Sequence, residues 1–313
     1  MITLQSDILK TLAYFDIFHY PLKNEEVRNF LSREVSQQLI DEQLTAMTEA
    51  DIIYKIDEFY ALHNDLFMVV RRRNGNKNAL AAMQNAVKAT KILSAFPFVE
   101  GLALSGSLSK NYADENTDID FFIITRSNRL WIARTLMHIF YRFAKLAGKR
   151  DWFCMNYYID ETALEIEEKN IYTAIEIVTL IPMQGAGTVQ AFMNENNWTK
   201  NYLPAYRTPK LNAVITNKGL IRKLLEVLLG GKVGNAIDNW LLQTTQKRWI
   251  KKEEQKNINA KGICMGMIAG KHFAKPDPEN FQDKILAQYR EKTNQFAVDY
   301  TNAQALAGQV FLL

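Results

Sequence analysis

Apolar and polar positions in the first part of the chain predict three short helices followed by a hairpin. Apolar residues recur at helical spacing, and two short runs rich in aromatic and β-branched residues are separated by Asp57-Glu58. The predicted helices cover 8–17, 24–31 and 37–48, and the predicted strands cover 52–56 and 59–62. We therefore expect a small domain over residues 1–65.

A polar, charged joint at 71–76 introduces a second pattern, in which strand-length apolar runs alternate with helical spacing. The strands are predicted over 99–105, 121–124 and 152–159, and the helices over 77–95, 130–147 and 170–180. This order predicts an α+β core, with strands flanked by helices, over residues 66–206. The remainder, 207–313, is predicted to be mainly helical, with a break at Gly230-Gly231.

The charge distribution differs between these parts. Residues 1–65 hold five Lys/Arg and twelve Asp/Glu, a net formal charge of −7, whereas the rest of the chain carries +11. Three helices and a hairpin form a winged-helix-like pattern, but the predicted helix at 37–48 contains no Lys or Arg. Because non-specific DNA affinity comes mainly from cations on phosphates, duplex DNA is not an expected partner. A packing or partner-binding role is favoured for this domain, and Arg71-Arg72-Arg73 is interpreted as a solvated face.

The cysteines and the apolar stretches indicate in which cellular compartment the protein is expected. The two cysteines, Cys154 and Cys264, are far apart and have no neighbour at metal-ligand spacing, which indicates neither a disulfide framework nor a zinc site. No uncharged apolar stretch reaches the roughly 18 residues of a membrane span, and the start of the chain has no signal-peptide pattern. We expect a cytoplasmic protein without a membrane partner.

The sharpest chemical signal is a glycine-serine pair followed by two aspartates. Gly106-Ser107 comes directly after a predicted strand, and Asp118 and Asp120 precede the next one. Because strand residues i and i+2 project from the same face, the two carboxylates should lie side by side. Like charges this close require a cation, and hard oxygen ligands suit Mg²⁺ bridged to phosphates. The glycine lets the backbone approach a phosphate, and the serine hydroxyl donates to it.

The segment from Gly106 to Asp120 resembles the signature of nucleotidyltransferases related to DNA polymerase β, in which a Gly-Ser turn precedes two aspartates at this spacing. Lys110 stands where these proteins usually carry a basic residue. A broader likeness, over about 67–206, is to uncharacterised prokaryotic proteins with a nucleotidyltransferase domain. The segments that carry it are 97–101, 106–107, 129–131, 154–157, 171–176 and 196–198.

The resemblance implies a mixed sheet and a metal-dependent transferase. Asp118 and Asp120 would bind Mg²⁺ or Mn²⁺ and act in catalysis, while Gly106, Ser107 and Lys110 would hold the phosphates of a nucleoside triphosphate, with ATP expected. A nucleoside monophosphate would pass to the hydroxyl of an acceptor, a small molecule, protein or RNA, that the sequence does not identify.

Three positions depart from the family pattern. Asn111 replaces a usual glycine, although asparagine also tolerates left-handed backbone angles. Asp114 replaces a usually basic residue near the phosphates. Asn156 stands at the centre of the strand where the family carries a third carboxylate, and an amide cannot accept a proton from a nucleophile. Asp151 and Asp160 flank that strand as alternatives.

These departures leave a second interpretation open. A site with two carboxylates and no base can bind nucleotide without catalysing transfer. The alternative to an enzyme is therefore a non-catalytic nucleotide-binding or protein-interaction module. A winged-helix transcription regulator is the weakest of the three hypotheses, since the −7 charge of residues 1–65 opposes it.

Overall fold

A six-stranded mixed sheet forms the centre of the computed structural model, which describes residues 3–115, 117–207, 219–254, 266–277 and 280–310. The strands are β4 (Val99–Leu104), β5 (Asp120–Thr125), β6 (Cys154–Asp160), β7 (Ile181–Gln184), β8 (Gly266–Ala269) and β9 (Phe273–Asp277). Their order is β7-β4-β5-β6-β9-β8; β5 and β6 are parallel, and the other pairs are antiparallel. The expected α+β class is confirmed.

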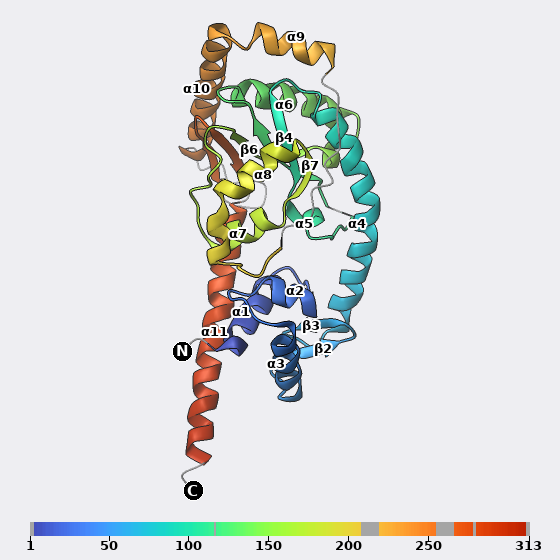
Figure 1. The fold of residues 1–313 in the computed structure, drawn as a ribbon, viewed down its shortest axis with the longest axis vertical. Helices are drawn as coiled ribbons and strands as arrows, with labels where there is room; N and C mark the ends of the chain where they lie inside the picture. The colour runs from blue at the N-terminus through green and yellow to red at the C-terminus, as the bar shows by residue number, and fades with distance from the viewer. Residues whose placement is uncertain (1–2, 116, 208–218, 255–265, 278–279, 311–313) are drawn as a thin grey trace.

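Helices cover both faces of this sheet (Figure 1). They are α4 (Leu66–Leu93), α5 (Gly106–Ser109), α6 (Leu130–Leu146), α7 (Ile171–Val178), α8 (Ala186–Glu195), α9 (Leu220–Leu228), α10 (Lys232–Glu254) and α11 (Phe281–Val310). Alternating strand residues decide the contacts, because Phe121 and Ile123 pack into the core under α4, α6 and α10. Phe122 and Ile124 point the other way, toward α7 and α8.

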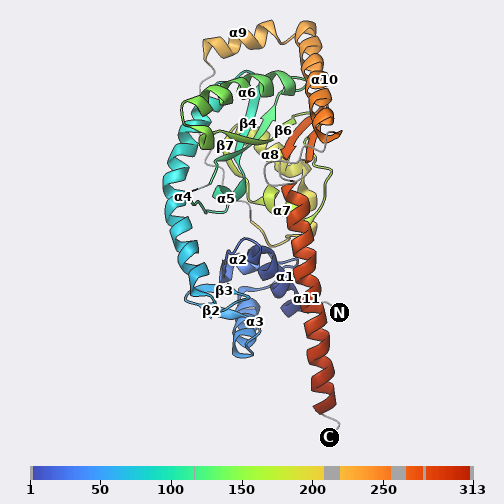
Figure 2. The same cartoon turned by 180° about the vertical axis from the view of Figure 1, so that it is seen from behind.

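The N-terminal module, residues 3–65, contains the three expected helices and the expected hairpin. Its elements are α1 (Leu4–Asp16), β1 (Leu22–Lys23), α2 (Asn24–Asn29), α3 (Gln37–Glu49), β2 (Tyr54–Ile56) and β3 (Phe59–Ala61). A two-residue strand that the sequence did not predict, β1, pairs with β3 and makes a three-stranded sheet. Figure 2 shows this module at one end of the molecule, away from α9.

The prediction of a break in structure at the polar stretch 71–76 is wrong. Helix α4 is continuous for 28 residues through this stretch. Straight-chain charged residues favour helix, and tertiary contacts stabilise the segment where its polarity suggested a loop.

The expected solvated face holds for Arg73, which is exposed, but not for Arg72, which is buried; all three arginines of this stretch join α4 to the N-terminal module. Arg72 is 3% exposed and donates to the Pro21 carbonyl at 3.0 Å and to Glu26 at 2.7 Å. Arg71 donates to the Phe18 carbonyl, and Arg73 donates to Glu58. A buried guanidinium is tolerated only when it is paired, so α4 and the module hold each other in place.

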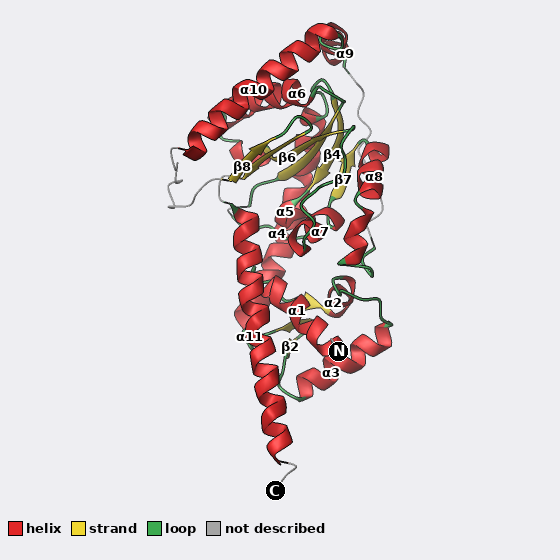
Figure 3. Ribbon diagram, turned by 90° about the vertical axis from the view of Figure 1, so that its left-hand side faces the viewer, coloured by secondary structure: helices red, strands yellow, loops and turns green. Residues whose placement is uncertain are grey.

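The C-terminal region contributes more than helices. The hairpin of β8 and β9 extends the central sheet by pairing with β6, although residues 207–313 were predicted to be mainly helical. The expected break at Gly230-Gly231 is confirmed between α9 and α10. Helix α11 then runs beside α1 along the N-terminal module, as Figure 3 shows in red. Within the described residues, no helix is both long and apolar enough to cross a membrane.

Gly75 lies inside α4 because the ring of Tyr112 occupies the space that a side chain would need. A Cβ at this position would lie 2.2 Å from that ring, and the Tyr112 ring is itself buried. Gly75→Ala should therefore lower the free energy of unfolding by about 1–3 kcal/mol, although alanine is the better helix former. Denaturant unfolding of the full chain measures this. Asn74→Ala, at the exposed neighbouring position, is the control, and a gain in stability at Gly75 would contradict the packing.

Candidate functional site

The corner between β4 and the next turn faces the start of β5. Strand β4 ends at Leu104, and the Ser105 amide donates to the Asp120 carbonyl at 3.0 Å. Gly106 has φ +66°, and a Cβ there would lie 2.1 Å from Oδ2 of Asp120. Both the left-handed backbone and the close carboxylate require glycine. The expected convergence of the glycine-serine corner with an aspartate is therefore present in the structure.

The two aspartates lie within electrostatic reach of each other. Asp120 begins β5 two residues before Phe122, which places it on the side of the sheet covered by α7 and α8. Burial is the main cause that raises the pKa of Asp120 to about 7, and the charges of Asp118 and Glu176 add to the rise. The pKa of Asp118 is also raised, first by burial and then by Asp151. Acidic groups therefore gather at this point, and both aspartates take up a proton more readily than an exposed aspartate does.

Strand β6 presents an amide and a thiol to this pair. Asn156 donates from Nδ2 to Oδ1 of Asp120 at 2.7 Å, and the Cys154 thiol donates to Oδ1 of Asn156 at 3.0 Å. Asn156 therefore reaches the carboxylate from the strand to which the resemblance assigns a third acid, but it does so as a donor. The sequence reasoning missed Cys154, although its i, i+2 spacing from Asn156 on one strand was a usable signal.

The two flanking acids of β6 lie at opposite ends of the strand. Asp151 is close enough to Asp118 to raise its pKa, and its carbonyl accepts from the Ile119 amide. Asp160 is fully buried at the far end, where it pairs with Nδ1 of His272 at 2.9 Å. The structure brings Asp151 to the aspartates and leaves Asp160 away from them.

Lys110, the expected phosphate ligand, is occupied by protein groups. Its Nζ lies 2.9 Å from a carboxylate oxygen of Glu176 on α7 and donates to the Gly106 carbonyl at 3.1 Å. Glu176 is therefore ion-paired, and it also raises the pKa of Asp120. A phosphate could meet Lys110 only in competition with this carboxylate.

The N-terminal module and α4 hold the loop that follows the glycine-serine corner. Tyr20 donates from its hydroxyl to the Lys110 carbonyl, and Asn76 donates to the carbonyl of Asn111. Asn111 has φ +57°, which confirms the left-handed angle that its glycine-like position requires. Arg71 lies 3.8 Å from the carboxylate of Asp114, so the acidic departure from the family pattern faces a cation.

The carboxylate oxygens of the two aspartates suit a divalent cation that takes its remaining ligands from water or from substrate. The two carboxylates, both with raised pKa, offer hard oxygen atoms of the kind that Mg²⁺ prefers. In the described part of the chain, however, no three His, Cys, Asp or Glu side chains are grouped to hold a metal. Asp118 and Asp120 would hold Mg²⁺ only together with water or substrate oxygens.

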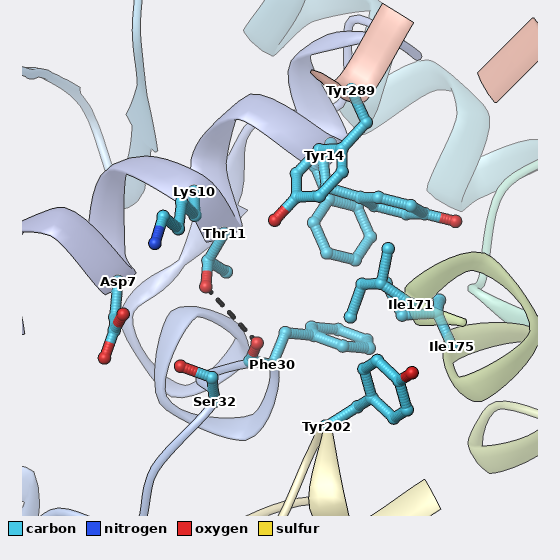
Figure 4. A pocket seen from close by; sticks show the side chains of 11 residues that line it. Asp7, Lys10, Thr11, Tyr14, Phe30, Ser32, Ile171, Ile175, Tyr202 and Tyr289 are labelled. Atoms are coloured by element: carbon cyan, nitrogen blue, oxygen red, sulfur yellow. Dashed lines mark hydrogen bonds between the residues drawn. The ribbon is translucent and has the colours of Figure 1, made fainter. Parts of the chain in front are cut away.

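A pocket elsewhere in the molecule lies between the N-terminal module, α7 and α11. Lys10, Thr11, Ile175, Tyr202 and Tyr289 are among its lining residues, as Figure 4 shows. Its volume is about 50 Å³, which has room for water and not for a nucleotide.

Stability should depend on pH through Asp120. Because its folded pKa is raised, the folded state keeps this proton between about pH 4 and 7, so the associated stability is present at low pH and lost as the pH rises through 7. In chelator, Asp120→Asn should unfold at a higher denaturant concentration than the native chain at pH 8, and at nearly the same concentration at pH 5. Asparagine keeps an oxygen that accepts from Asn156. A variant that is less stable at both pH values would contradict the raised pKa.

Comparison with protein-family models, curated proteins and solved structures finds no match for this chain. A function for it is therefore supported by the geometry of the site and by the resemblance of its signature.

Proposed function

We propose that this chain is a divalent-metal-dependent nucleotidyltransferase that moves a nucleoside monophosphate from a triphosphate, with ATP expected, to an acceptor hydroxyl. One observation carries the proposal: the α-carbon of Gly106 faces the Asp120 carboxylate so closely that no side chain fits between them. Asp118, which precedes β5, is close enough for its charge to raise the pKa of Asp120. A triphosphate entering the corner would meet backbone, serine hydroxyl and two carboxylates together.

The two aspartates would bind the metal, and the other residues of the site would position the phosphate and the carboxylate. Asp118 and Asp120 would hold Mg²⁺ or Mn²⁺, which when bound neutralises phosphate charge in the transfer step. The Ser107 hydroxyl would donate to a phosphate at the Gly106 turn. Asn156 fixes Oδ1 of Asp120 by its 2.7 Å hydrogen bond, so that carboxylate keeps one orientation.

Lys110 is proposed as a phosphate ligand that must first leave Glu176. Two groups that compete for one ammonium make nucleotide affinity depend on the loss of that ion pair. The acceptor remains open to a small molecule, a protein or RNA.

A second candidate function, nucleotide binding without transfer, is favoured by Asn156. An amide in the place of a carboxylate removes one metal ligand and the base toward the attacking hydroxyl. Asp151 approaches Asp118 and is the alternative base, but no shared group of three ligands forms among the described side chains.

For the N-terminal module we propose a winged-helix-like fold that packs on the core and does not bind duplex DNA. The module holds α4 through Arg72 and contacts the site loop through Tyr20. Its α3 offers no Lys or Arg to a DNA backbone, and residues 1–65 carry a net formal charge of −7.

The first test is pyrophosphate release from ATP with Mg²⁺, together with transfer of label from α-labelled ATP to acceptors in a cell extract. Asp118→Asn with Asp120→Asn should reduce both by about a hundredfold or more, because the variant removes both metal ligands. Asp51→Asn is the matched control, since this exposed aspartate lies in the N-terminal module at φ +55°, where asparagine is tolerated. Activity unchanged in the double variant would refute the proposal. ATP binding by calorimetry without release would support the second candidate function.

A second test concerns the ion pair. Glu176→Gln frees Lys110 and removes a negative charge near Asp120, so ATP should bind several-fold more tightly, measured by calorimetry at constant Mg²⁺. Glu195→Gln on the neighbouring α8 should leave the affinity unchanged. Weaker binding in Glu176→Gln would show that the carboxylate serves the nucleotide directly.

A further inference from the structure

The apolar side of helix α9 faces solvent, whereas an ordinary surface helix turns its apolar side toward the core. Two of its polar residues face the core: Arg222 is 2% exposed, donates to the carbonyls of Ser94 and Val99 at 2.6 and 2.7 Å, and pairs with Glu226. Its large apolar side chains point outward instead. Those on α9 are Leu220, Ile221, Leu224, Val227 and Leu228, which are 59–84% exposed.

The same outward character continues onto α10. Val233 is 66% exposed and Trp240 is 63% exposed. The five α9 side chains recur at helical spacing and so share one side of that helix; with Val233 and Trp240 of α10 they are defined here as the α9 face. Figures 1 and 2 show α9 and the start of α10 at the end of the molecule opposite the N-terminal module. Single exposed leucines are ordinary, whereas a contiguous exposed apolar patch of this kind marks a contact surface.

The exposed charges on α9 and α10 have one sign. In the described segment 219–251, the exposed charged side chains are all cations: Lys223, Lys232, Lys247, Arg248 and Lys251. The acids of that segment, Glu226 and Asp238, are turned into the protein. The neighbouring helix α6, which packs against α10, contains no Asp or Glu. The opposite end of the molecule carries the −7 of residues 1–65.

We propose that the α9 face docks on an anionic lipid bilayer, with the aliphatic side chains of α9 inserted at the level of the headgroups. An apolar stripe bordered by lysines, with a tryptophan beside it, has the chemistry of an interfacial helix. The expectation of no membrane partner rested on the lack of a stretch that spans a bilayer, and this mode needs none, because such a helix lies in the surface and does not cross it. The acidic module at the far end is repelled, so the molecule stands on its α9 end.

Two other occupants fit less well. A second copy would bring the cations Lys223 and Lys232 of both chains into one interface without exposed acids in the described segment 219–251 to pair them, which opposes a two-fold contact. A nucleic acid would use the lysines, but it gains little from five aliphatic side chains and needs aromatic stacking, for which the face offers only Trp240.

The test is flotation of the full chain with two kinds of vesicle, phosphatidylcholine alone and an equimolar mixture of phosphatidylcholine and phosphatidylglycerol. Binding should occur with the anionic vesicles and weaken as salt rises. Leu224→Ser with Val227→Ser should reduce the partition coefficient about tenfold or more, because two inserted side chains are lost. Phe67→Ser with Leu80→Ser, at α4 positions that are 71% and 69% exposed, is the control and should leave binding unchanged.

Lys223→Gln with Lys232→Gln should weaken binding to the anionic vesicles only. Equal binding to both vesicle types, or no effect of the α9 variant, would overturn the proposal. It would also be overturned by a concentration-dependent dimer, seen in sedimentation without lipid, that the same serine variant dissolves, since a second copy would then cover the face. Binding of single-stranded RNA in place of vesicles would exclude the bilayer. None of these outcomes depends on nucleotide transfer.

Discussion

The candidate site depends on how closely the backbone at Gly106 approaches the carboxylate of Asp120. Antiparallel pairing of β4 with β5 brings the end of one strand to the start of the other, and only a residue without Cβ turns the chain there. The same approach removes water from Asp120 and raises its pKa. Geometry and electrostatics at the site therefore have one origin. A larger residue at position 106 would displace the acid and not merely fill a gap.

The sequence predicted the parts of the fold whose signals are local. Strands β4, β5 and β6 and helices α6 and α7 were found because their apolar runs and spacings are strong, and the corner with its two aspartates was found from spacing alone. Contacts between distant segments were not accessible in this way. Residues 71–76 were polar enough to be interpreted as a joint, and the contacts of the N-terminal module with them support a continuous helix. The hairpin of β8 and β9 gave too short a signal to separate it from its helical surroundings.

The hydrogen-bond and ion-pair partners of the site residues were harder to predict than the site residues themselves. Asn156 was recognised as a departure, but its hydrogen bond to Asp120 follows from the register of β5 and β6, which no spacing gives. Lys110 was assigned to phosphate from its position in the signature, whereas the fold of α7 brings Glu176 to it. Electrostatic partners of a site residue come from whichever element packs nearby, and a single sequence does not contain that information.

The grip of the N-terminal module on the site loop has a mechanical consequence. Tyr20 donates a hydrogen bond to the Lys110 carbonyl. Arg72, which is buried on α4, donates to the carbonyl of Pro21, the residue that follows Tyr20. Separating the module from the core would break both hydrogen bonds, so the position of the module is coupled to that of the site loop. Any molecule that pried it from α4 would also loosen the backbone next to the glycine-serine corner. Displacement of the acidic module would therefore change the shape of the glycine-serine corner.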